Sequence, residues 1–312
     1  MKTKKIENTL YDNVFLRNFW PIGTTGHVSN YNLDTTRNFL ANFVSEVSDN
    51  NVTFIDSHFG KKSIFDKITN KLISNIIKKQ YIAHGYEMEL IKTAKALYIW
   101  YTSENRRPPL NLEYDLFLSH DLEPYNDRNL YLPFWATKLG NNLNESTINQ
   151  KKLMLNRKIN SVPTNFACTI VSNPEPARME FIRQLSKIGK VDIYGKLGME
   201  LSSKTKLLNK YRFNVCFENS IFPGYVTEKP FESWECESIP IWSGFDAGNY
   251  LNPSAIINVN EFGFRNSLDK ISFLEKNPSE IHKILQLPIL IKPFDFNDLV
   301  NKAKYLLDNK SI

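Results

Sequence analysis

Cysteines are scarce in this sequence, with only three among 312 residues, and they stand far apart at positions 168, 216 and 236. No Cys-x-x-Cys pair occurs, and the odd count argues against a framework of disulfides. Long apolar runs are also missing, and no apolar stretch of a signal peptide follows the basic N-terminus. These absences predict a reducing, cytoplasmic location, with membrane contact limited to the periphery of the inner face.

The charge balance is mildly basic, with 39 lysines and arginines against 33 acidic residues and a formal net charge of +6. Such a surplus suits a nucleotide or another polyanion, an acidic membrane surface, or no partner at all. The lysines are spread along the chain rather than interleaved with aromatic side chains, which disfavours binding to nucleic acid. A non-catalytic basic protein that binds a glycan or a nucleic acid is the alternative from another functional class.

Short apolar runs alternate with stretches of helical spacing, which is typical of an α/β protein with mostly parallel sheets. Strands are expected at residues 14–20, 52–55, 96–101, 114–119, 166–172, 191–194, 213–217, 239–242 and 255–259. Helices are expected at residues 64–79, 87–95, 176–188, 201–211, 230–236 and, with a break at 288–293, over 268–309.

The polar stretch 139–163, with a helix near 149–156, predicts a linker between two Rossmann-like domains. The N-terminal domain would span residues 1–155 and bind an acceptor. The C-terminal domain would span residues 156–312 and bind a nucleotide, with its last helices returning to pack on the first domain.

The segment 212–229, RFNVCFENSIFPGYVTEK, concentrates residues suited to a nucleotide. Its strand delivers Glu218 at the carboxyl end, the edge at which ligands of open α/β sheets bind. The free N–H groups of the following helix and the ammonium of Lys229 suit a diphosphate. Glu228 can accept hydrogen bonds from ribose hydroxyls, and Tyr225 can pack against a base or a ribose. An ordinary capped helix start explains the same Thr-Glu-Lys sequence without a ligand.

The same segment resembles the signature of the α-1,3/4-fucosyltransferases, glycosyltransferase family 10. The family has a Phe-Glu-Asn-Ser/Thr run and, several residues later, Tyr-Val/Ile-Thr-Glu-Lys, which stand here as FENS at 217–220 and YVTEK at 225–229. Weaker similarities follow in the family's order at YTSENRRPP (101–109), NDR (126–128) with LP (132–133), VSNP (171–174), VDIYGK (191–196) and IPI (239–241). The resemblance covers roughly residues 95–260.

This resemblance implies a GT-B-type α/β fold of two Rossmann-like domains that face a central cleft. It implies an inverting transfer of L-fucose from GDP-β-L-fucose to a hydroxyl of an oligosaccharide acceptor. The expected hydroxyl is the 3-OH of N-acetylglucosamine in an N-acetyllactosamine-like unit, as in Lewis antigens. No cofactor is implied beyond the donor substrate, with a divalent cation only as an optional stimulant. A GT-B glycosyltransferase that uses another nucleotide sugar is the alternative within this fold.

The resemblance places Glu104 where the family has its proposed base, with a surface glutamate paired to Arg106 or Arg107 as the alternative. Glu218 is the competing carboxylate, or else a structural one that is bonded to backbone N–H groups. It assigns Lys229 and Lys196 to the departing GDP. Relatives usually carry Arg near position 196, and a lysine there keeps the charge but loses the two-pronged contact to phosphate. Arg178 is a candidate to share that task.

Further contacts to the nucleotide or to fucose carry over by resemblance to Asn219, Tyr225 and Glu228. Ser172 and Asn173 stand at the end of the first strand of the C-terminal domain, and we expect them to line the same pocket.

Patterns that bind metal ions are missing as well. The sequence has no Asp-x-Asp triplet, and its five histidines show no ligand spacing. No metal site is therefore expected. Two of the histidines, His27 and His120, are candidates for a place near the cleft, at the acceptor site.

Overall fold

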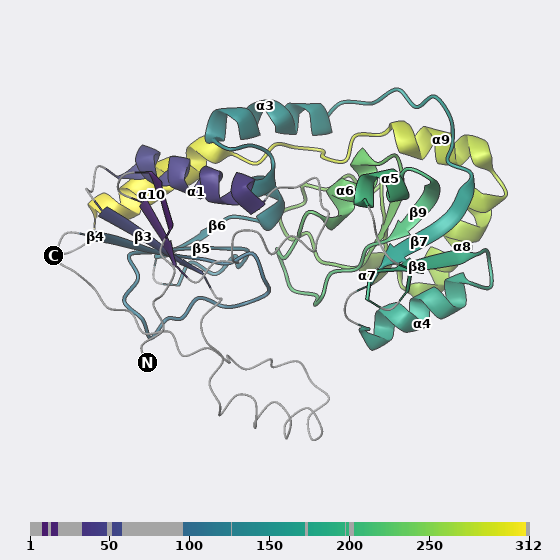
Figure 1. The fold of residues 1–312 in the computed structure, drawn as a ribbon, viewed down its shortest axis with the longest axis horizontal. Coiled ribbons are helices and arrows are strands. Elements are labelled where there is room, and N and C mark those ends of the chain that lie inside the picture. The colour runs from purple at the N-terminus through teal and green to yellow at the C-terminus, as the bar shows by residue number, and fades with distance from the viewer. Residues whose placement is uncertain are drawn as a thin grey trace, which may run out of the picture.

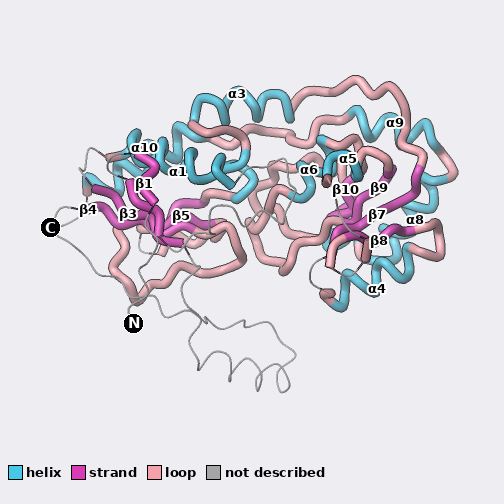
Figure 2. Tube along the Cα trace, viewed as in Figure 1, coloured by secondary structure: helices cyan, strands magenta, loops and turns pink. Residues whose placement is uncertain are grey.

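The computed structural model describes residues 8–11, 14–17, 33–48, 52–57, 96–125, 127–171, 174–196, 198–199 and 203–309. In this part of the chain two sheets form, one in each half, and helices lie against both (Figure 1; Figure 2). The strands pair in parallel apart from one antiparallel pair at the N-terminal edge. The predicted α/β class with parallel sheets is confirmed.

The N-terminal sheet has six strands in the order β1-β2-β3-β4-β5-β6. They span Asn8–Tyr11, Val14–Arg17, Val52–Ser57, Ala96–Tyr101, Leu116–Ser119 and Asn129–Tyr131. Strand β4, with the sequence ALYIWY, is buried at five of its six positions. Continuous burial of this kind is typical of a parallel strand that is covered on both faces.

The C-terminal sheet has five strands in the order β11-β10-β9-β7-β8. In chain order β7 to β11 span Asn165–Ile170, Val191–Tyr194, Tyr211–Val215, Ile239–Trp242 and Ile257–Asn258. Strand β8 lies on one side of β7, and β9 lies on the other, so the direction of winding reverses between β7 and β9. Such a switch point opens a crevice at the carboxyl ends of the strands, where ligands bind. The segment after β9 begins at this crevice.

The described helices connect the strands and cover the sheets. They are α1 Leu33–Val47, η1 Phe134–Lys138, α3 Leu143–Leu153, α4 Pro176–Leu185, α5 Lys204–Leu208, α6 Lys229–Glu235, α7 Val259–Phe262, α8 Phe264–Glu275, α9 Pro278–Gln286 and α10 Phe296–Asp308. None of these helices is both long enough and apolar enough to cross a membrane.

Several boundaries differ from the sequence-based expectation for local reasons. Helix α3 begins six residues earlier than expected, because the side chain of Asn142 accepts a hydrogen bond from the backbone N–H of Glu145 at 2.9 Å and caps the helix there. Helix α5 is shorter than the expected 201–211, because Ser203 caps its start and the chain turns before β9. The expected helices at 64–79 and 87–95 lie outside the described residues.

Four described elements of the N-terminal half were not expected, namely α1, β1, β6 and η1. In α1 the buried residues Phe39, Phe43 and Val47 recur every four positions, which is a helical pattern. The strands β1 and β6 have only four and three residues, too few for alternation to stand out.

One apolar core cluster joins the two halves of the chain, while the C-terminal sheet also has a core of its own. Helix α10 returns from the end of the chain and lies beside α1 against the N-terminal sheet (Figure 1). The ring of Phe296 lies 5.6 Å from that of Phe39. Nearer the middle of the molecule, Trp135 of η1 stacks on Phe231 of α6 at 5.0 Å. These contacts tie the C-terminal chain to both domains.

Replacing Phe296 tests this return of the chain. Phe296 is 3% exposed, whereas Tyr305 on the same helix is 66% exposed. We expect Phe296→Ala to lower the free energy of unfolding by about 3–5 kcal/mol, because it leaves a cavity between the helix and α1. Urea denaturation measures the effect, with Tyr305→Ala as the matched control. Equal and small effects in both variants would show that α10 does not pack in this way.

Candidate active site

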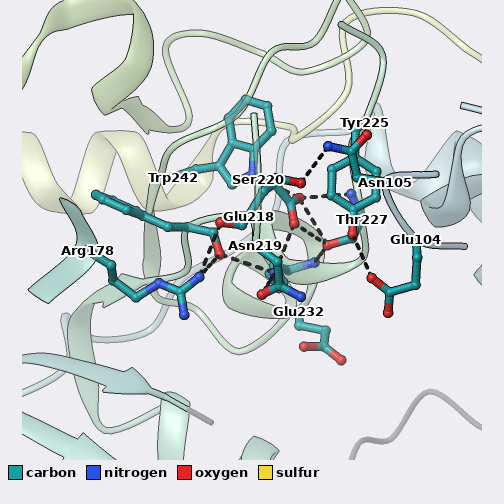
Figure 3. Close-up of polar contacts among 12 residues, drawn as sticks. Glu104, Asn105, Arg178, Glu218, Asn219, Ser220, Tyr225, Thr227, Glu232 and Trp242 are labelled. Carbon is teal, nitrogen blue, oxygen red and sulfur yellow. Dashed lines mark hydrogen bonds and ion pairs between the residues drawn. The ribbon is translucent and has the colours of Figure 1, made fainter. Parts of the chain in front are cut away.

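A buried carboxylate organises the loop between β9 and α6. Glu218 accepts hydrogen bonds from the backbone N–H of Thr227 at 2.9 Å, from the Thr227 hydroxyl, and from the indole N–H of Trp242 at 3.1 Å (Figure 3). The ammonium of Lys229 pairs with it at 3.0 Å, and the Glu218 side chain is fully buried. All its contacts are therefore inside the protein, and its place in the site is to shape the loop rather than to touch a nucleotide.

Two cations lie at the end of β9. The ammonium of Lys229 also donates to the carbonyl of Phe217 at 3.2 Å and to the side-chain oxygen of Asn219 at 3.3 Å. Arg178, on α4, donates to the carbonyls of Phe217 and Glu218 at 3.0 and 3.2 Å. Both positive charges thus lie at the switch-point crevice, next to the exposed side chain of Asn219. Helix α6 has only seven residues, so its dipole adds little to these full charges.

Glu104 reaches the same place from the other domain. It follows β4, and its backbone N–H bonds to the Thr102 hydroxyl at 3.1 Å. The hydroxyl of Tyr225 donates to its carboxylate at 3.4 Å (Figure 3). Burial raises the pKa of Glu104 above 4.5, and the charge of Glu228 adds to this, while Lys229 works against it. A half-buried carboxylate with a raised pKa is suited to accept a proton.

Tyr225 contributes its hydroxyl rather than its ring. The side chain is 2% exposed, and the ring packs on that of His120 at 4.9 Å. The expected stacking on a base or ribose is therefore not available in this arrangement. Glu228 is half-buried at the start of α6, and its charge raises the pKa of both Glu104 and Tyr225, which shows that the three groups are neighbours.

Lys196 is not brought to this cluster. It follows β8, the edge strand, which β7 separates from β9, and it is exposed. Ser172 and Asn173 lie outside the described residues, as does His27. Among the described residues, no group of His, Cys, Asp or Glu side chains is arranged to hold a metal ion.

Sequence reasoning missed several contributors to the site. Trp242 counted only as the last residue of a strand, yet that position beside β9 brings its indole to Glu218. Lys204 forms an ion pair with Glu232 of α6, whose side chain is 4% exposed. The partners are 28 positions apart, and nothing in the local sequence signals the pair.

Comparisons with known proteins relate this chain to one family of enzymes. Residues 161–286 match the family model described as glycosyltransferase family 10 (fucosyltransferase) C-term. The chain is 28% identical over 260 residues to the alpha-(1,3)-fucosyltransferase FucT of Helicobacter pylori, a match that covers 73% of this chain and 53% of that protein. Against the human 4-galactosyl-N-acetylglucosaminide 3-alpha-L-fucosyltransferase FUT5 the identity is 35% over 113 residues, or 33% of this chain and 29% of that one.

The chain thus spans about half the length of the Helicobacter pylori relative, and 46% of the human 3-galactosyl-N-acetylglucosaminide 4-alpha-L-fucosyltransferase FUT3. A solved α1,3-fucosyltransferase structure with GDP-fucose superposes with a TM-score of 0.57 at 21% identity, over 90% of this chain and 99% of that one. The architecture is that of the GT-B-type glycosyltransferases. The similarity to glycosyltransferase family 10, the fucosyltransferase family, thus rests on residues 161–286, which match the model of its C-terminal domain.

The buried carboxylate can be tested without a substrate. We expect Glu218→Ala to lower the free energy of unfolding by about 3 kcal/mol, because it leaves Lys229 and the indole of Trp242 without their partner. Glu180→Ala removes an exposed carboxylate paired with Arg183 and serves as the control, with little effect expected. Chemical denaturation measures both variants, and a Glu218→Ala protein as stable as the control would contradict this account of the loop.

Proposed function

We propose that this protein transfers L-fucose from GDP-β-L-fucose to a hydroxyl of an oligosaccharide acceptor, with inversion at the anomeric carbon. One observation carries the proposal. The half-buried carboxylate of Glu104, from the N-terminal half, accepts a hydrogen bond from Tyr225 of the segment that matches family 10, and Lys229 of the same segment lies at the end of the C-terminal sheet. A base and a cation for the leaving group thus face each other across the domain boundary.

The reaction needs one base and one leaving-group cation. Glu104 takes the proton of the acceptor hydroxyl as its oxygen bonds to the anomeric carbon of fucose. The bond from that carbon to the phosphate oxygen breaks on the opposite face, and the electron pair leaves with GDP. A direct displacement of this kind turns a β-linked donor into an α-linked product.

We assign to Lys229 the role of stabilising the negative charge on the departing GDP. In the free protein its three N–H donors all contact protein oxygens, on Phe217, Glu218 and Asn219. The contact to Asn219 is the longest at 3.3 Å and the exposed one. We infer that a diphosphate oxygen replaces Asn219, while the buried pair with Glu218 keeps the ammonium in place.

The acceptor we propose is an N-acetyllactosamine-like unit, fucosylated at the 3-OH of N-acetylglucosamine. The Helicobacter pylori relative is an alpha-(1,3)-fucosyltransferase, and human FUT5 is a 3-alpha-fucosyltransferase. FUT3 is a 4-alpha-fucosyltransferase, so the relatives support fucose transfer more strongly than the position of the linkage.

A cytoplasmic location, with at most peripheral contact to the inner face of a membrane, is part of the proposal. It is supported by Cys168, Cys216 and Cys236, which are buried free thiols. Burial raises the pKa of each of these thiols, which suits unreactive side chains in a reducing compartment.

The direct test is a mass spectrum of N-acetyllactosamine after incubation with the protein and GDP-fucose. We expect a product heavier by one deoxyhexose. Parallel reactions with GDP-mannose and UDP-galactose test the alternative of another nucleotide sugar. Transfer from one of these donors, with GDP-fucose left intact, would overturn the choice of fucose.

The pH dependence tests Glu104 as the base. Because burial raises the pKa of Glu104, we expect kcat to fall as the pH is lowered through a value above 4.5. In Glu104→Gln the fall of kcat at low pH should disappear, and the rate should drop by about 10²- to 10⁴-fold.

The stability of Glu104→Gln separates a functional from a structural effect. The folded state binds the proton of Glu104 more tightly than the unfolded state, so ionisation costs stability as the pH rises from the ordinary pKa through the raised one. At neutral pH the variant should therefore melt at the same or a higher temperature. A large loss of melting temperature would contradict the assignment.

Lys229 and Lys196 make a matched pair for donor binding. Lys229→Ala should weaken GDP binding by about tenfold or more, because a charge-assisted contact is worth at least about 1.5 kcal/mol. Lys196→Ala, at the exposed sheet edge, should have little effect. Calorimetric titration with GDP measures both, and the reverse order of effects would move the leaving-group cation to Lys196.

A further inference from the structure

Arg107 links the two halves of the protein close to Glu104. The guanidinium of Arg107 donates to Nε2 of His120 at 2.8 Å and to the side-chain oxygen of Asn105 at 2.7 Å. Its Nε lies 3.5 Å from the carboxylate of Asp121, which is buried. These three partners belong to the N-terminal domain. The guanidinium also lies 3.2 Å from the centre of the Phe222 ring, which belongs to the C-terminal domain.

His120 accepts from Arg107 as a neutral imidazole. Since Arg107 donates into Nε2, the ring proton is on Nδ1, which is buried and has no hydrogen-bond partner among the described residues. Burial and the charge of Arg107 lower the pKa of His120 to about 3. The ring packs edge-on against Phe222 at 5.8 Å and Tyr225 at 4.9 Å. His120 therefore stays an uncharged packing and accepting group at any working pH.

Two further contacts cross the boundary at the same place. The side-chain amide of Asn105 donates to the Ser220 hydroxyl at 2.5 Å (Figure 3). Gly224 has a φ of +83°, and a Cβ there would lie 2.4 Å from the carbonyl oxygen of His120. The backbone at Gly224 thus lies directly against the N-terminal half. Any side chain at this position would collide with the His120 carbonyl, and the positive φ also favours glycine.

These contacts immediately flank the reacting groups. Asn105 follows Glu104 in the chain, and Tyr225 follows Gly224, so the network fixes both ends of the 3.4 Å contact between Glu104 and Tyr225. Arg107 joins the two sides, because it orients Asn105 and His120 while its planar face rests on Phe222.

We propose that Arg107 is a positioning residue for the reaction. It holds the base Glu104 in place relative to the donor-binding loop, because its guanidinium lies against the ring of Phe222. We call this contact between Arg107 and Phe222 the clasp. This inference rests on the proposed function, since it assigns Arg107 a part in the same transfer. Among the described residues, no hydrogen bond or ion pair joins Arg107 to Lys229, so we expect Arg107 to act on kcat through Glu104 rather than on donor binding.

The test is a split between kcat and donor affinity in Arg107→Gln. We expect kcat to fall by about 10²-fold, because a displacement of about 1 Å at a reacting group costs that much. GDP affinity by calorimetry should be largely unchanged. Arg183→Gln, an exposed arginine on α4, is the control. An unchanged kcat, or a loss of GDP affinity in step with kcat, would overturn the proposal.

A double-mutant cycle with Phe222→Leu tests whether the clasp acts as one unit. Leucine keeps apolar bulk but removes the aromatic face under the guanidinium. We expect Phe222→Leu to lower kcat, and the double variant to be no slower than Arg107→Gln alone. Additive losses would mean that the two side chains act independently.

Hydrogen exchange in the absence of any donor separates this inference from the proposed function. In Arg107→Gln, the backbone amides of residues 218–225 should exchange faster than in the wild type, and those of the core strand β9 should not. If the wild type transferred no fucose, the proposed function would fail, and faster exchange would still support the clasp. Unchanged exchange in residues 218–225 would overturn the clasp, whatever the activity.

Discussion

The ordering of the site depends on one buried carboxylate. Glu218 gathers the backbone and hydroxyl of Thr227, the indole of Trp242 and the ammonium of Lys229 into one network. A buried charge is tolerated only when it is paired and fully hydrogen-bonded, so this network permits a single loop conformation. That conformation sets where the C-terminal loop presents its cation and where it turns toward the other domain.

The second requirement is that the two halves of the chain keep a fixed relative position, since the proposed base comes from one half and the proposed leaving-group cation from the other. The apolar cluster that joins the halves includes Trp135 stacked on Phe231, and α10 lies against α1. The polar contacts of Arg107 lie between the two halves beside Glu104. A small displacement there would separate Glu104 from Tyr225 of the C-terminal loop. Apolar packing thus holds the two halves together, and Arg107 fixes the position of Glu104 relative to the C-terminal loop.

Sequence patterns predicted the features that form within continuous segments, but not the contacts between residues far apart in the chain. The α/β class, the strands around the switch point and the group of Glu218, Tyr225 and Lys229 all lie in continuous segments whose pattern is readable. The contact of Asn105 with Ser220 spans 115 positions, and no local pattern announces it. For Glu218 the sequence left open a place beside the nucleotide or a structural one bonded to backbone N–H groups. The hydrogen bonds from the backbone of Thr227 and from Trp242 on the neighbouring strand favour the structural place.

The most direct test of the account is the anomeric configuration of the product, read by NMR after the protein has acted on GDP-β-L-fucose and N-acetyllactosamine. A base on the acceptor side and a cation on the GDP side predict a single displacement, and therefore α-linked fucose on the acceptor. A β-linked product would require a second displacement and a nucleophile on the enzyme. That result would contradict Glu104 as the base and the mechanism built on it.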